Sequence, residues 1–529
     1  MNTLRKRELF LSLKYCTIEA CFSVPMLALT LGNAPFLGAY ASKVLGWSDQ
    51  AVGLLSALHY ATLFAQPPLT YWLQRRFSLF HVTVLGFLFN ILPWPLTALF
   101  PVLPATTANV IFTCVVATAS FANAFCGVAW TAAVSEVVPL HIRGRFFGKR
   151  WVVFTFWSLV TTLVVQQVVK FFETPERAVM LPTVFGWIFT ALALLRLCGL
   201  CFFYRMKFPS VVMEPRPPAP PVRAFAEVFR DGNFMRFVAV IGLFNFCFYL
   251  GQPFYGVFLL KDCGFQIGDV TVLFVVQSLG NMASFAAWGR LTDRFGNKPI
   301  MMASGALWFA TAAVAWQFTR PGRHAHVYAN YFVTGFMMAG CQQVGLFTLM
   351  MKLTPAHSRA NHLSVYYALA NLFGALGAAL GGQLLRWLPR DAGSWFGQPL
   401  TNYHVFIVGS LLLCLLVLHL LQFVHEPAER PMRELVQEMG RMREFNPVLG
   451  LGELARVFTP GGLGRLAGAS WRTLRRQTSA VSAVGEHLAE DGWRALKQPL
   501  KAFSKDEDLA QDAGPDGLRR KNGPGKPGE

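Results

Sequence analysis

The chain has 529 residues, of which 54% are hydrophobic and only 14% are charged, and its mean hydropathy is +0.41. Soluble domains hold about 45–50% apolar and about 25% charged residues, so the composition excludes a disordered protein and disfavours a soluble enzyme. Most of the net charge of +19 falls on residues 1–425, which hold 30 Lys and Arg against 13 Asp and Glu. These basic residues lie in short loops between apolar runs, a pattern that indicates membrane topology and not nucleic-acid binding.

Twelve stretches are apolar enough to cross a bilayer, which takes roughly 20 residues each. They lie near residues 12–39, 52–73, 79–100, 107–134, 150–170, 182–204, 236–259, 269–289, 299–319, 328–351, 364–387 and 403–424. The basic N-terminus leads straight into the first stretch without a small-residue cleavage site, so we expect an uncleaved anchor. The sequence therefore predicts an all-α, multi-pass membrane protein.

The distribution of Lys and Arg predicts the orientation. One set of loops carries about 20 basic residues and the other set about 8, and the richer set is expected in the cytoplasm. With an even number of spans, both termini are then cytoplasmic. We expect the protein in a cell membrane of the bacterial inner-membrane type, with the lipid bilayer as its partner and with a monomeric chain.

The two halves of the apolar region resemble each other. At an offset of 216 residues, VPLHIRG (138–144) aligns with TPAHSRA (354–360). At an offset of 218, the ends of the first and seventh spans match: Pro35, Phe36, Gly38, Lys43 and Gly46 align with Pro253, Phe254, Gly256, Lys261 and Gly264. Six spans are thus followed by six related spans in the same orientation, which is a transporter architecture.

The loop GRLTDRFGNKP (289–299) resembles a loop motif of the major facilitator superfamily, whose consensus matches at Gly289, Asp293, Arg294, Gly296 and Lys298. Together with the twelve-span plan, the resemblance covers roughly residues 10–425. It implies two pseudo-symmetric six-helix bundles that rock about a central site, by alternating access. One departure stands out, because Arg75 occupies the position of the Asp in the equivalent loop after the second span.

This organisation predicts four regions. They are an N-terminal six-helix bundle (1–205), a Pro-rich cytoplasmic linker (206–235), a C-terminal six-helix bundle (236–425) and a cytoplasmic tail (426–529). Apolar residues at helical spacing within 431–443 and 481–503 fit amphipathic helices on the inner membrane surface, or else a segment that binds a partner. From about Lys505 the composition is typical of disorder.

The resemblance implies a gate at the cytoplasmic ends of the helices. Asp293, next to Arg294, is expected to face the start of the fifth span, where Arg143 and Arg150 lie, because a helix N-terminus favours an anion. We expect Arg150 and Asp293 within ion-pair reach when this side is shut. The alternative is that these residues serve only the positive-inside topology.

Two other pairs are candidates for gating or coupling. The repeat maps Glu136 onto Lys352, so these opposite charges could meet as a gate, or else remain two solvated charges at helix ends. Glu19 and Arg196 lie at similar depth inside the membrane, about 8 residues from the inner ends of their spans, and a charge there usually has a partner. Glu19 is then either a proton-coupling acid or half of a structural ion pair.

Neutral polar and aromatic residues within the spans are the candidates for substrate binding, because such groups are costly against lipid. Amides and aromatic faces suit a neutral, hydroxylated ligand, although amides also link helices to one another. The candidates are Asn123, Trp130, Trp157, Gln166, Asn245, Tyr249, Gln252, Gln277, Asn281, Gln342, Gln343 and Tyr367.

Several sequence signals argue against other functions. The chain has no phosphate-binding loop, Cys198 and Cys201 lie in an apolar span, and the pair His324 and His326 has no further ligands nearby, so we expect no metal, no cofactor and no enzyme. The sequence predicts secondary transport of a small organic solute, neutral or sugar-like, with coupling to protons. The alternatives are an efflux pump for apolar compounds and a transport-silent scaffold or sensor.

Overall fold

A computed structural model describes most of the chain. It covers residues 6–30, 36–37, 40–41, 44–47, 62 and 65–441, with short gaps at 173, 175, 216–219, 266, 323–324 and 396–397. Most of the predicted span 52–73 lies outside the described residues. So do His324, the segment 481–503 and the residues from Lys505 onward.

The first half is helical throughout its described part. Its elements are α1 (Lys6–Thr30), α4 (Gln66–Arg76), α5 (Leu79–Ile91), η1 (Trp94–Val102), α6 (Ala105–Val137), η2 (Leu140–Ile142), α7 (Arg143–Phe172), η3 (Ala178–Met180) and α8 (Leu181–Tyr204). The linker holds the short helices α9 (Ser210–Met213) and α10 (Pro221–Arg230). The predicted spans 79–100, 107–134, 150–170 and 182–204 each coincide with a helix, or with a helix continued by a 3₁₀ helix, and residues 12–30 of the predicted span 12–39 lie in α1.

The second half repeats this plan and adds a hairpin and a tail helix. Its elements are α11 (Gly232–Lys261), α12 (Ile267–Phe295), α13 (Asn297–Gln317), α14 (Ala325–Met338), the π-helix η4 (Ala339–Leu346), α15 (Phe347–Leu353), α16 (Arg359–Trp387), β1 (Asp391–Trp395), β2 (Gln398–Thr401), α17 (Asn402–His419), η5 (Leu420–Phe423) and α18 (Met432–Arg441). Among the described residues, eleven helices are long and apolar enough to cross a membrane. The predicted all-α fold of two related bundles is confirmed, with one antiparallel hairpin added.

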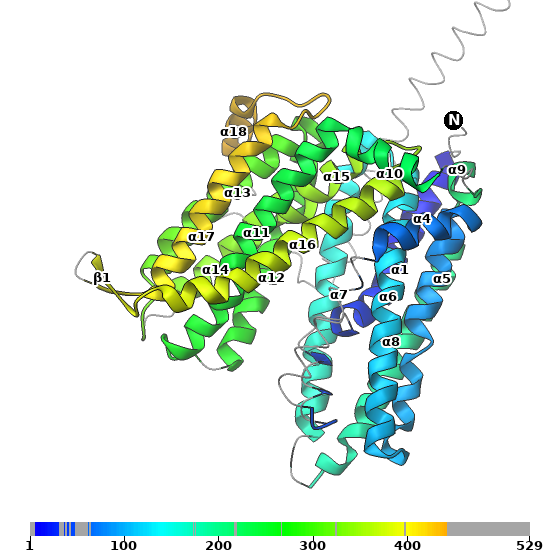
Figure 1. The fold of residues 1–529 in the computed structure, drawn as a ribbon, viewed down its shortest axis with the longest axis horizontal. Helices are drawn as coiled ribbons and strands as arrows, with labels where there is room; N and C mark the ends of the chain where they lie inside the picture. The colour runs from blue at the N-terminus through cyan, green and yellow to red at the C-terminus, as the bar shows by residue number, and fades with distance from the viewer. Residues whose placement is uncertain are drawn as a thin grey trace, which may run out of the picture. The chain divides into compact units, whose positions relative to one another are not determined.

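The helices of each half pack mainly against one another, α1 against α8 and α5 against α6 in the first half, α11 against α16 and α12 against α14 in the second (Figure 1). The halves meet chiefly where α7 packs on α12 and α4 on α16. We call the end of the bundles where α12 ends and α7 begins the Asp293 end. The opposite end, which carries β1 and β2, is the hairpin end.

Two glycines show that the repeat extends to the backbone. Gly46 and Gly264, which the repeat aligns, both adopt the left-handed conformation, with φ of 70° and 75°. A side chain is strained in that conformation and glycine is not, so the repeat retains glycine at both positions.

The tail helix α18 does not lie on a lipid surface. Leu435 on α18 is fully buried in a core cluster with Phe295 of α12 and Ile300 of α13, and Met432 and Met439 pack against the same cluster. For the described residues 432–441 the membrane-surface interpretation is therefore wrong, because the protein itself covers most of the apolar face of this helix. Val436, at the side of that face, stays exposed.

Candidate functional site

The Asp293 carboxylate caps the start of α7 in the opposite half. It accepts hydrogen bonds from the backbone N–H of Gly144 at 2.6 Å and of Arg145 at 2.9 Å, and the Arg145 Nε lies 3.4 Å away. Two glycines allow this close approach, since a Cβ on Gly144 or on Gly289 would lie within 2.7 Å of the facing backbone. The contact places a negative charge on the positive end of the α7 dipole.

The expected Arg150–Asp293 ion pair is absent, although Asp293 does face the start of α7. Arg150 lies about two helical turns further along α7 and binds Glu19 instead, at 3.1 Å. Arg145 supplies the charge beside Asp293. Arg294 also turns away from the junction, and forms an ion pair with Glu438 of the tail helix.

A second contact between the halves joins Glu136 to Arg359. The Arg359 Nη1 donates to the Glu136 Oε1 at 2.5 Å and to the Ser135 Oγ at 2.8 Å, and both charged side chains are nearly buried. The predicted pairing of Glu136 with Lys352 is therefore wrong. Lys352 belongs to the last turn of α15 and binds the fully buried Glu426 within its own half at 2.8 Å.

Arg143 also stays within its own half. Its Nη2 donates to the carbonyl oxygens of Ser135 at 2.7 Å and Val138 at 3.2 Å, where α6 ends. Repeat-related Arg143 and Arg359 thus both bind near the end of α6, but only Arg359 crosses between the halves.

The predicted Glu19–Arg196 pair is not formed either. The Glu19 Oε2 accepts from the Arg150 Nη2, and Arg150 also donates from Nε to the Cys16 carbonyl at 3.4 Å and stacks on Trp130 at 4.4 Å. Arg196 is 2% exposed and lies over the Phe87 ring. Its Nε and Nη1 have no hydrogen-bond partner in the described part of the chain. Lys14, near Glu19 on α1, is exposed.

A cavity of about 410 Å³ lies inside the second half. It is lined by α11, α12, α13 and α14 with single residues of η4 and α17, and none of its described lining residues is charged. Four of the predicted substrate-binding residues line it: Tyr249, Gln252, Gln277 and Gln342. Amides and aromatic rings therefore do share one cavity.

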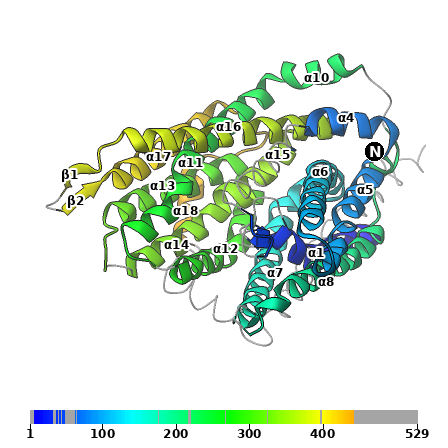
Figure 2. The same cartoon turned by 60° about the horizontal axis from the view of Figure 1, so that its bottom comes forward.

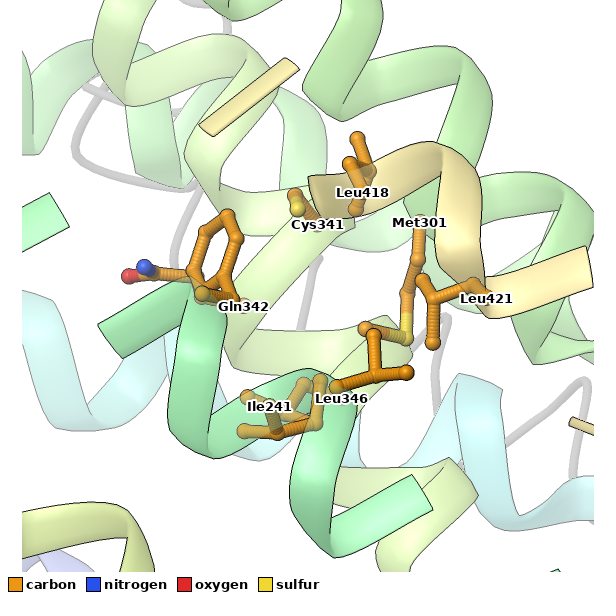
Figure 3. Close-up of a pocket in the computed structure, with 9 residues that line it drawn as sticks. Ile241, Met301, Cys341, Gln342, Leu346, Leu418 and Leu421 are labelled. Carbon is orange, nitrogen blue, oxygen red and sulfur yellow. The ribbon is translucent and has the colours of Figure 1, made fainter. Parts of the chain in front are cut away.

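The π-helix η4 carries two of the candidate amides. An α-helix interrupted by a π segment is frequent at functional sites. Next to Gln342, Cys341 of η4 lies in an apolar contact with Met301 of α13, Leu418 of α17 and residues of α11. The Gln342 amide points away from these side chains (Figure 3). The neighbouring Gln343 has a buried Oε1 without a hydrogen-bond partner among the described residues.

The other candidates do not line this cavity. Asn245 donates to the Ala370 carbonyl at 3.2 Å and so links α11 to α16. Asn281 is buried in α12, and Gln166 is exposed on α7. Asn123, Trp130, Trp157 and Tyr367 are half-buried or exposed on α6, α7 and α16.

Sequence reasoning missed several residues of both sites. Trp308, Trp316, Asn330 and Tyr331 line the cavity, and Asn330, Thr334 and Met338 follow one another at four-residue spacing on α14. That spacing was a usable signal for one face of the helix. Arg145 binds Asp293 through its backbone N–H as well as its guanidinium, and no residue pattern indicates the backbone contact.

Comparisons with known proteins agree on one family. The sequence profile described as "Major Facilitator Superfamily" matches residues 252–499, and no curated protein sequence matches the chain. The E. coli fucose:proton symporter FucP is similar in structure, with a TM-score of 0.61 and 11% identity over 78% of this chain and 98% of that one. The proton:xylose symporter XylE has a TM-score of 0.57 and 16% identity over 81% of this chain and 99% of that one. The human organic anion transporter TETRAN has a TM-score of 0.54 and 15% identity over 78% of this chain and 98% of that one.

Proposed function

We propose that the chain is a member of the major facilitator superfamily, whose profile matches residues 252–499, and that it moves a small organic solute across a membrane by alternating access. The supporting observation is that the carboxylate of Asp293 and the guanidinium of Arg359 both join the halves at the Asp293 end. This arrangement fits a state that is shut at the Asp293 end, which the excess of Lys and Arg assigns to the cytoplasm.

The uncharged cavity supports a sugar-like solute. Amide groups bind hydroxyls by hydrogen bonds, and the aromatic rings of Trp308 and Trp316 offer flat apolar faces. The part of the solute that enters this cavity is therefore neutral and hydroxylated. The structurally similar FucP and XylE are symporters of a sugar and a proton, which agrees with this choice and with coupling to protons.

Flux into liposomes tests the proposal. Purified full-length protein reconstituted with a panel of radiolabelled sugars and sugar derivatives should give saturable flux that an inward proton gradient drives above equilibrium. Gln252→Ala together with Gln342→Ala should lower that flux, while Gln166→Ala, which changes an amide outside the cavity, serves as the matched control. Absence of flux for the whole panel would contradict the proposal.

Proton coupling can be tested separately at Glu19. Glu19→Gln keeps the size of the side chain and removes its titration, so a coupling residue should lose proton-driven accumulation and retain solute exchange. Normal accumulation by this variant would contradict a coupling role.

Efflux of apolar compounds is the second candidate, because Phe248, Phe274 and Met338 also line the cavity. A thermal-shift screen distinguishes the two candidates: stabilisation by sugars supports the first, and stabilisation by hydrophobic drugs alone supports the second. A scaffold or sensor would show ligand binding without any flux.

The proposed orientation has its own test. In a variant without the native cysteines, Cys introduced at Ser394 on the hairpin should react with an impermeant reagent from outside intact cells. Cys at Ser210 in the linker should react only after lysis. The reverse pattern would overturn the assignment of the Asp293 end to the cytoplasm.

A further inference from the structure

The interior of the first half holds two arginines and one carboxylate. Glu19 of α1 binds Arg150 of α7, and Arg196 of α8 has no ion-pair partner among the described residues. An uncompensated cation inside a membrane protein is costly. The cluster therefore lacks one negative charge in this state.

Arg196 and a neighbouring serine form a second place for the Glu19 carboxylate. Ser23 follows Glu19 by one helical turn on α1, and its buried Oγ also lacks a partner in the described part of the chain. Gly199, nearly one turn after Arg196, packs on this same face, since a Cβ there would lie 2.6 Å from the Ser23 Oγ and 3.3 Å from the Glu19 carbonyl. Three unused hydrogen-bond donors thus belong to the α1–α8 contact beside Glu19.

Arg150 is the more accessible of the two guanidinium groups. Its side chain is 12% exposed, and its guanidinium carbon lies 4.4 Å from the centroid of the Trp130 ring. Trp157, about two turns further along α7, is 37% exposed. A guanidinium suits a carboxylate, which it can bind through two parallel hydrogen bonds.

We propose that the transported solute carries one carboxylate, which binds Arg150 once Glu19 has moved from Arg150 to Arg196. In the empty state one arginine is paired and the other is not; in the loaded state the solute pairs with Arg150 and Glu19 with Arg196. Solute binding therefore removes an unpaired buried charge. The inference rests on the proposed function and narrows it: a hydroxylated solute that also carries the carboxylate for Arg150 is a hydroxylated monocarboxylate such as a sugar acid.

Glucuronate and glucose test this proposal, because they share a ring and differ in one carboxylate. Calorimetry on the purified full-length protein should show tighter binding of glucuronate, and Arg150→Gln should abolish that preference. Glu19→Gln removes the competing carboxylate and should tighten glucuronate binding by about tenfold, whereas Arg196→Gln should weaken it by about tenfold. Lys14→Gln, which removes an exposed charge from α1, should leave both affinities unchanged.

The signs of these changes separate the exchange from a purely structural ion pair. Ser23→Ala leaves every charge in place, so it should fold and should weaken glucuronate binding alone, even if a charge variant fails to express. Equal affinity for the acid and the sugar, or weaker glucuronate binding in Glu19→Gln, would overturn the proposal. If glucose binds and is transported while glucuronate is not, the carboxylate site fails and the proposed function stands; if neither solute binds and the whole panel gives no flux, the proposed function fails as well.

Discussion

The turns that join α4 to α5 and α12 to α13 are related by the repeat, yet they are stabilised in different ways. In the first, Ser78 caps its own helix by accepting from the His81 N–H. In the second, the cap of α13 comes from Glu426, more than a hundred residues away in sequence. Gly296 takes the place of the capping serine, with φ of 97°.

The difference extends to the contacts that each turn makes. Asp293 of the second turn binds the start of α7, whereas the equivalent Arg75 is exposed and stacks on Tyr71. The second turn is also bound by the tail, through Arg430 to the Phe295 carbonyl and through Glu429 to Lys298. The turn in the first half thus caps only its own helix. The equivalent turn in the second half binds both the first half and the tail.

The largest expected effect is the difference in stability lost when each of the two caps is removed. Glu426 is 1% exposed and accepts from Asn297, the Lys298 backbone N–H and Lys352, so Glu426→Gln leaves the half-buried Lys352 without its counter-charge. Removing one member of such a group costs about 3–5 kcal/mol of stability, whereas Ser78→Ala, which removes a single cap, costs about 1 kcal/mol. Thermal unfolding in detergent should therefore show a larger loss for Glu426→Gln than for Ser78→Ala.

A matched control lies three residues further along the chain. Glu429 binds Lys298 but is one-third exposed, so Glu429→Gln should cost less than Glu426→Gln. Equal losses at Glu426 and Ser78 would show that the distant cap contributes no more than the local one.

Asp293→Asn tests the contact between the halves. The variant keeps the side-chain shape but removes the charge from the start of α7, a contribution of up to about 2 kcal/mol in a buried site, so the shut state should lose population more than tenfold. Spin labels on Arg76→Cys and Arg433→Cys should report longer distances across the Asp293 end. Asp269→Asn, at the other end of α12, should not change them. An unchanged distance distribution in Asp293→Asn would remove Asp293 from the gate.

Arg75→Asp adds a carboxylate to the first turn, where Asp293→Asn removes one from the second, and it should have a smaller effect. It restores the missing carboxylate in the first turn, near α16, which packs on α4. An exposed carboxylate at a helix start contributes about 0.3–1 kcal/mol, so the same labels should report a modest gain of the shut state. A loss of that state would mean that the two junctions are not equivalent in space.

The spans and the repeat could be predicted from the sequence because the bilayer fixes the length of each apolar run. The partners of the charged residues could not, because depth along a helix does not give its rotation. Arg150 and Arg196 were both candidate charges near Glu19, and only the packing of α1 between α7 and α8 selects Arg150. Glu136 likewise meets Arg359 and not Lys352, since Lys352 faces Glu426 in its own bundle.

The candidate cavity shows the same limit. Residue type alone makes twelve polar and aromatic residues equal candidates for substrate binding, and four of them line the cavity. Asn245 has the same chemistry, but its amide links α11 to α16. The tail helix was detected by its periodicity, but whether lipid or protein covers its apolar face depends on the contacts of Leu435.

The starts of α7 and α16, which the repeat also relates, have different partners. Asp293 binds the first, while the linker helix α10 lies beside the second (Figure 2) and joins it through Glu227, which accepts from the His357 Nε2 at 2.5 Å. Burial raises the pKa of the Glu227 carboxyl, but hydrogen bonds from His357 and Ser358 and the charges of His357 and His362 together outweigh burial and leave this pKa below its ordinary value. Both side chains are largely exposed, so the tether is weak.

A lowered pKa sets the direction of the pH dependence. The folded protein holds the Glu227 proton less tightly than the unfolded chain, so the tether contributes its full stability above the unfolded pKa of about 4.3 and loses it as the pH falls through the lower folded value. Glu227→Gln should therefore unfold slightly more easily than the parent at pH 6, and the two midpoints should converge toward pH 3. Glu214→Gln, elsewhere in the linker, is the control. A difference that grows as the pH falls would show that α10 is not held to α16 by this carboxylate.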